Sequence, residues 1–107
     1  MKNDNVEKEI LNLIAMVRES TTPQHAQKLI EKLSWLYIET AGKIDEFICT
    51  NVLDRIAAIG DASIIPYLEE FVATAKNSNL PDTVLSNLRM DIGLVTAVCI
   101  YRQRSTK

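Results

Sequence analysis

The chain has 107 residues, 47% of them hydrophobic, with three glycines and three prolines. This composition excludes a disordered or low-complexity protein, because so many apolar side chains can offset the entropy lost when the chain orders. The 12 basic and 14 acidic residues give a net charge of −2, so the chain lacks the general positive field that attracts nucleic acid. We expect a single all-helical domain, residues 1–107, whose core needs no disulfide or metal.

The first helix is predicted over about residues 6–17. Its apolar residues recur at three- and four-residue steps, as they do on one face of a helix. Asp4 and Glu7 have the spacing of a capping box at its start. The stripe consists of Val6, Ile10, Leu13, Ile14 and Val17.

The second helix is predicted from Pro23 to about Thr40. Thr22 is the expected N-cap, and proline suits the first helical position because it lacks an amide hydrogen that this turn cannot use. Gly42 is the expected C-cap, since glycine accepts the left-handed conformation. The apolar stripe consists of Ala26, Leu29, Ile30, Leu33, Leu36 and Tyr37.

Three more helices follow. The third covers about residues 44–59, and the fourth has Pro66 in its first turn and ends at the turn formers of residues 77–82. The fifth runs from Asp82 to about Arg102, and Gly93 inside it is expected to mark the close approach of another helix. No segment alternates with period two, so we predict an all-α fold. The apolar positions are Ile44, Phe47, Ile48, Val52, Ile56 and Ile59, then Leu68, Phe71, Val72 and Ala75, then Val84, Leu85, Leu88, Ile92, Val95, Val98 and Cys99.

Residues 48–68 carry a distinctive pattern. An alanine-rich helix end leads into a turn where glycine lets the chain reverse and aspartate can accept amide hydrogens, and an apolar pair, proline and leucine open the next helix. The positions are Ala57, Ala58, Ile59, Gly60, Asp61, Ile64, Ile65, Pro66 and Leu68. This stretch resembles the inner part of a HEAT-like helical repeat of the short bacterial type, also found in phycobilin lyase-associated proteins. The resemblance implies a right-handed superhelical stack of five helices. A compact helical bundle is the alternative, because a solenoid usually needs about three repeats.

The sequence offers no assembled catalytic or metal site. His25 is the single histidine and has no second histidine or cysteine at ligand spacing, so we expect it on the surface. The neighbouring carboxylates at 45–46 and 69–70 point about 100° apart on a helix and do not form acid–base dyads. Asp54 and Arg55 are expected to form a structural ion pair. We therefore predict no enzymatic activity, no metal and no cofactor.

Localisation is inferred from the cysteines and the chain ends. Cys49 and Cys99 are expected to be buried free thiols, which suits a reducing cytoplasm. The N-terminus is charged where a signal peptide is apolar, and no stretch reaches about eighteen apolar residues, so we expect a cytoplasmic protein without membrane contact. Arg102, Arg104 and Lys107 complement the dipole at the end of the last helix. Nucleic-acid binding by this tail is the less favoured alternative.

A partner-binding patch is predicted from Trp35, Tyr67 and Glu70. Trp35 lies off the main stripe of its helix, and tryptophan suits an interface anchor. Tyr67 and Glu70 lie on the second helix of the HEAT-like hairpin, which in that family lines the concave binding side. Trp35 as an ordinary core residue is the alternative.

The function predicted from these features is a non-enzymatic protein-binding or scaffolding module. Its size and acidic balance also fit immunity or inhibitor proteins of bacteria. One alternative is a small-ligand-binding helical domain with Trp35 or the Tyr37 region as a pocket wall. Another is a self-associating protein with a dimer seam at Tyr37, Ile38 and Tyr101.

Overall fold

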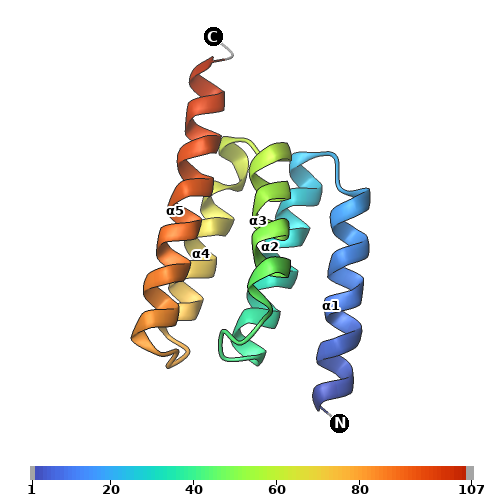
Figure 1. The fold of residues 1–107 in the computed structure, drawn as a ribbon. Helices are drawn as coiled ribbons and strands as arrows, with labels where there is room; N and C mark the ends of the chain where they lie inside the picture. The colour runs from blue at the N-terminus through green and yellow to red at the C-terminus, as the bar shows by residue number, and fades with distance from the viewer. Residues whose placement is uncertain (1, 106–107) are drawn as a thin grey trace.

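The computed structural model describes residues 2–105, which form five α-helices and one short 3-10 helix, without a β-strand among them. This confirms the all-α prediction. In chain order the elements are α1 (Lys2–Glu19), α2 (Pro23–Glu39), α3 (Glu46–Ile59), η1 (Ala62–Ile64), α4 (Ile65–Lys76) and α5 (Asp82–Ser105), as Figure 1 shows.

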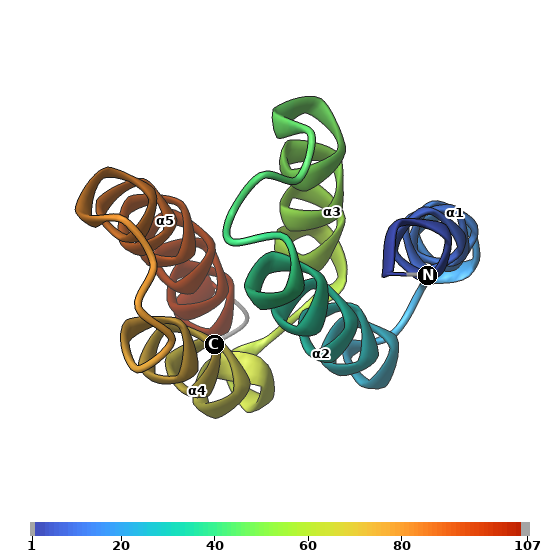
Figure 2. The same ribbon diagram turned by 90° about the horizontal axis from the view of Figure 1, so that it is seen from below.

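The helices lie in two layers. α1, α3 and α5 run in the same direction in one layer, and α2 and α4 run in the opposite direction in the other (Figures 1 and 2). α2 packs against α1, α3 and α4, while α5 packs against α3 and α4. The shortest dimension of the molecule is 20 Å, which matches two layers of helices about 10 Å thick. α1 and α5 are thus the two edges of the three-helix layer. The right-handed superhelical stack stays a prediction.

The core lies between the layers. It holds nearly all of the predicted stripe of α2 at full burial, including Leu29, Leu33 and Leu36. Tyr37 packs edge-on against Phe71 with ring centroids 5.8 Å apart, and its hydroxyl donates to the carbonyl of Val84 at 3.5 Å. Tyr37 therefore belongs to the core rather than to a dimer seam or a pocket wall.

The helix starts follow local hydrogen bonds. Thr22 Oγ1 accepts the amide of His25 at 3.2 Å, which confirms Thr22 as the cap of α2. Asp45 Oδ1 accepts the amides of Phe47 and Ile48 at 2.9 and 3.2 Å and starts α3 two residues later than expected. The capping box at Asp4 is wrong, because α1 already begins at Lys2.

The turn between α3 and α4 keeps its predicted elements but uses the glycine differently. Asp61 Oδ1 accepts the amide of Ser63 at 2.9 Å, and Pro66 stands in the first turn of α4. Gly60 has φ −81° and ψ 163°, which any residue can adopt. A Cβ at this position would lie 2.4 Å from Cδ1 of Ile64, so space rather than backbone freedom requires glycine. Gly42, by contrast, has φ +78° and does use the left-handed region.

α5 differs from the other helices because its own apolar side chains lie on both its buried side and its exposed side. Leu88, Ile92, Val95 and Cys99 are buried, yet other large apolar residues on the same helix are exposed. A Cβ added at Gly93 would have nothing within 4 Å of it, so the expected close approach of another helix is wrong. By length and composition alone, the segment Asp82–Gln103 is apolar enough to cross a membrane, and it is the single such helix within residues 2–105. In its most apolar window, 22% of the residues are buried. This segment was missed at the level of sequence, because only an unbroken run of apolar residues was considered.

Candidate functional site

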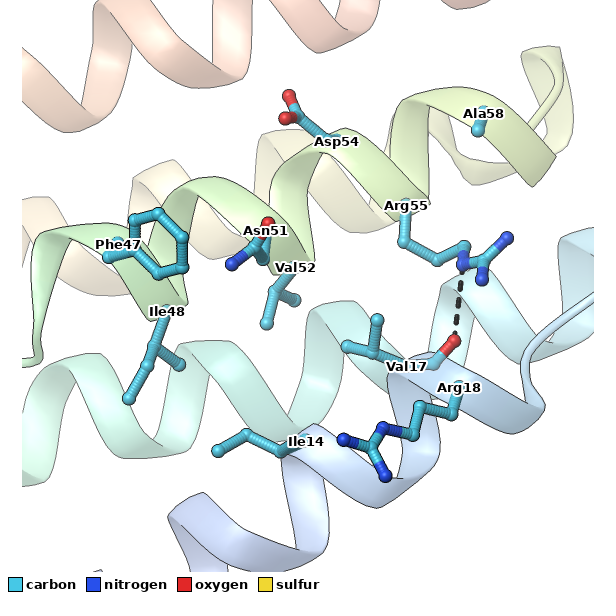
Figure 3. A pocket seen from close by; sticks show the side chains of 10 residues that line it. All are labelled: Ile14, Val17, Arg18, Phe47, Ile48, Asn51, Val52, Asp54, Arg55 and Ala58. Carbon is cyan, nitrogen blue, oxygen red and sulfur yellow. Dashed lines mark hydrogen bonds between the residues drawn. The ribbon is translucent and has the colours of Figure 1, made fainter.

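A groove runs between α1 and α3 on one edge of the molecule, and we call it the α1–α3 groove. It encloses about 580 Å³. Figure 3 shows its walls, with α3 along one side and α1 along the other. The groove is lined by Ile14, Val17, Arg18, Phe47, Ile48, Asn51, Val52, Asp54, Arg55 and Ala58.

The floor of the groove is apolar. Val52 is buried at 1% exposure, and Ile14, Val17 and Ile48 are half-buried around it. At the lip, Phe47 keeps 76% of its surface exposed, although its helical position predicted a core residue. The Asp45 cap makes Phe47 the second residue of α3, next to the half-buried Ile48 of the groove floor. An exposed phenylalanine beside an apolar hollow is a typical protein-docking feature.

Two arginines stand at the other end of the groove (Figure 3). Arg55 Nε donates to the carbonyl of Val17 at 3.1 Å. This carbonyl lies in the last turn of α1, where it also accepts the amide of Ser20 at 3.4 Å, and its bond to Arg55 ties α1 to α3. Arg18 is exposed beside it. Asp54 points away from α1 in Figure 3, so the predicted Asp54–Arg55 ion pair is replaced by the bond to Val17.

The predicted patch of Trp35, Tyr67 and Glu70 is only partly brought together. Tyr67 and Glu70 line a second hollow of about 330 Å³ between α2 and α4, together with Ile30, Glu31, Ser34, Phe71 and Thr74. Trp35 is 45% exposed on α2, so it is not an ordinary core residue, but it lies outside the residues that line this hollow. The patch stays a prediction.

The single histidine and the two cysteines lie outside the α1–α3 groove. His25 is half-buried, and its Nδ1 accepts the amide of Thr21 at 2.9 Å beside the start of α2. Burial, with Asp91 and Glu46 nearby, raises the pKa of Cys49 to about 11, and burial also raises the pKa of Cys99. Thiols with raised pKa values stay protonated at neutral pH and are poor nucleophiles. Residues 2–105 contain no group of three or more His, Cys, Asp or Glu side chains arranged to hold a metal.

Of the basic residues predicted at the end of the last helix, Arg102 makes a hydrogen bond within the fold. Arg102 Nη1 donates to the carbonyl of Gly60 at 2.6 Å and so joins the end of α5 to the end of α3. Hydrogen bonds from the Ser63 hydroxyl and amide, with Arg102 nearby, lower the pKa of Asp61 in the same turn. The side chain of Arg104 and all of Lys107 lie outside the described part of the chain, so nucleic-acid binding stays a disfavoured prediction.

The α1–α3 groove was missed at the level of sequence. One signal could have indicated it: the apolar stripe of α3 is too wide for one neighbour, because Phe47 and Ile48 are adjacent and point in different directions.

Comparison with protein-family models, curated proteins and solved structures gives no match. The likeness to a HEAT-like repeat therefore rests on residues 48–68 alone.

Proposed function

We propose that the chain is a non-enzymatic protein-binding module that receives an amphipathic helix of a partner protein in the α1–α3 groove. The observation that carries the proposal is the exposed Phe47 at the lip of an apolar floor. Helix-in-groove recognition of this kind uses apolar residues at steps of three and four along the partner helix.

The dimensions of the groove suit a short helix. Phe47 and Ala58 mark its two ends along α3, and at 1.5 Å per residue they lie about 17 Å apart. About three helical turns of a partner span this length, which offers three or four apolar anchors. Covering Phe47 alone contributes about 2 kcal/mol of favourable transfer free energy.

The arginines suggest the charge of the partner. Arg18 is exposed at the end of the groove, and the Nε of Arg55 is already used by Val17. A carboxylate at the end of the partner's apolar stripe would meet Arg18 without displacing that bond. The favoured partner is thus an amphipathic helix with an acidic residue at one end. An enzyme neutralised in the cytoplasm, as by immunity or inhibitor proteins, is one partner class compatible with this small acidic domain and its free thiols.

The test is selection of 18-residue amphipathic helices from a displayed library on the purified protein, followed by affinity measurements by fluorescence anisotropy. Phe47→Asp is expected to weaken binding at least tenfold, and Arg18→Glu to weaken binding of the peptides that carry an acidic end. Leu11→Asp is the matched control, because Leu11 is 66% exposed on α1 but does not line the groove. Selected peptides that bind Phe47→Asp as tightly as the wild type would overturn the proposal.

A small apolar ligand with a carboxylate is the second candidate. The groove volume of about 580 Å³ lies within the roughly 300–1,000 Å³ of ligand pockets, which favours this alternative specifically. A fluorescent fatty-acid analogue that binds the wild type with micromolar affinity, and Phe47→Asp much more weakly, would support it. Absence of binding to both proteins would remove this candidate.

A further inference from the structure

The outward side of α5 is an apolar face that is largely open to solvent within residues 2–105. We call it the α5 outer face and define it by Met90, Gly93, Leu94, Ala97, Val98 and Tyr101. At one margin of this face, Leu94 and Val98 also line a hollow of about 260 Å³ between α3 and α5. Met90, Leu94 and Tyr101 are 64%, 65% and 73% exposed, and Val98 is 41% exposed. These side chains expose apolar surface on the order of 500 Å², the size of the largest, often functional, patch on a typical monomer.

The opposite side of α5 already belongs to the core. Leu88 and Cys99 are at most 1% exposed there, and Ile92 and Val95 are nearly as well covered. A helix that is apolar on both sides is normally covered on both sides. Since α5 is the edge of its layer (Figure 2), no helix of residues 2–105 packs on the outward side of α5.

The order of residues on the α5 outer face is self-complementary. Met90, Leu94, Ala97 and Tyr101 follow one another at steps of four, three and four, the spacing of a coiled-coil seam. When a second α5 is laid antiparallel, with the two-fold axis between Val95 and Thr96, Leu94 faces Ala97 of the other copy. Met90 then faces Tyr101, and sulfur–aromatic contacts are favourable.

From this pattern we propose that the α5 outer face joins two copies of this chain through an antiparallel pair of α5 helices. The four large side chains of both copies together bury about 1,000 Å², the area that a specific interface needs, and the rim adds more. A modest interface of this size predicts a dimer that dissociates on dilution. The α1–α3 groove lies at the opposite edge of the layer, so the dimer leaves two grooves open and could hold two partner segments at once.

A membrane is the competing cover for this face. Inserting α5 across a bilayer would strip Leu88 and Ile92 from the core and would bury Arg89 and Asp91, each at a cost of about 3 kcal/mol. Pairing with a second copy keeps the core intact and leaves both charges at the edge of the interface. The second copy is therefore favoured over the bilayer.

The first test is the solution mass of the full chain by light scattering over a hundredfold dilution from about 500 μM. We expect twice the 12.0 kDa of one chain at the top of the range and a fall on dilution. Leu94→Glu is expected to stay at 12.0 kDa throughout, whereas Leu11→Glu, at nearly equal exposure on α1, behaves as the wild type. A wild type that stays monomeric, or a Leu11→Glu variant that dissociates as Leu94→Glu does, would overturn the inference.

The second test addresses the antiparallel register. Leu94→Glu and Ala97→Lys should each be monomeric, because each places a charge against an apolar residue. Mixed together, they should form a heterodimer, since the new glutamate faces the new lysine while a native Leu94–Ala97 contact remains. Both positions are exposed, and circular dichroism checks that the variants are folded. A mixture that remains monomeric overturns the antiparallel pairing. Leu94-dependent binding of the monomer to vesicles of phosphatidylcholine and phosphatidylglycerol, without dimerisation, overturns the second copy in favour of a membrane.

Discussion

Replacing Gly60 with alanine should destabilise the protein by lack of space, not by backbone strain. The new Cβ would lie 2.4 Å from Cδ1 of Ile64 and 2.7 Å from the carbonyl oxygen of Ile56. Ile64 is 1% exposed, so its methyl group has no open space to move into. The Ile56 carbonyl accepts the amide of Gly60 itself at 2.8 Å, so moving it weakens the last hydrogen bond of α3. Overpacking costs about 1–3 kcal/mol and a weakened hydrogen bond about 1 kcal/mol, so we expect a loss of about 3 kcal/mol.

Urea denaturation and a double-mutant cycle with Ile64→Val test this reasoning. Valine lacks Cδ1, so Ile64→Val alone costs about 1 kcal/mol, but in the Gly60→Ala background it also removes the closest clash. The double variant should therefore be about 1 kcal/mol more stable than the sum of the single losses predicts. A Gly60→Ala protein within about 0.5 kcal/mol of the wild type, or strictly additive losses, would refute the steric explanation.

Three further predictions concern the groove, a thiol and α5. Arg55→Met keeps the apolar stem of the side chain but removes the hydrogen bond to the carbonyl of Val17. We expect faster amide hydrogen exchange in the last turns of α1 and, in urea denaturation, a loss of about 1–2 kcal/mol in the free energy of unfolding. Unchanged hydrogen exchange would contradict this prediction. Cys49 has a folded pKa of about 11, above that of an unfolded thiol, so its contribution to stability is complete below about pH 8.5 and is lost as the pH rises through 11. Cys49→Ala should flatten this alkaline loss of stability, and an unchanged pH profile would argue against the burial of the thiol. Gly93→Ala should stabilise the monomeric Leu94→Glu variant by up to about 1 kcal/mol, because alanine favours the helix and nothing lies within 4 Å of the added methyl group. A loss of stability would mean that another part of the protein packs against position 93.

Much of the secondary structure was predictable because local chemistry determines it. Thr22 and Pro23 placed the start of α2 correctly, and the Asn-rich turn formers around residue 79 ended α4. The apolar stripe of α2 became core almost residue for residue, since α2 is surrounded by α1, α3 and α4. The apolar periodicity thus indicated the correct buried side wherever a helix has neighbours across the core.

The surfaces were less predictable, because exposure depends on which neighbour is present. Phe47 and Val98 carry the same periodic signal as core residues, yet they face solvent, Phe47 near the start of α3 and Val98 on the edge helix α5. Gly93 has the sequence context of a close helix contact, but the structure places it on the open side of α5. Hydropathy does not distinguish a core residue from a docking residue, so both the α1–α3 groove and the α5 outer face became visible only in three dimensions.

The most direct test of the proposed function is a nuclear magnetic resonance titration of the protein with a library-selected amphipathic helix. We expect the backbone amide shifts to change along α3 from Phe47 to Ala58 and in the last turns of α1, and the changes to disappear in Phe47→Asp. Shift changes centred instead on Tyr67 and Glu70, in the hollow between α2 and α4, would contradict the groove as the binding site and would support the patch predicted from sequence.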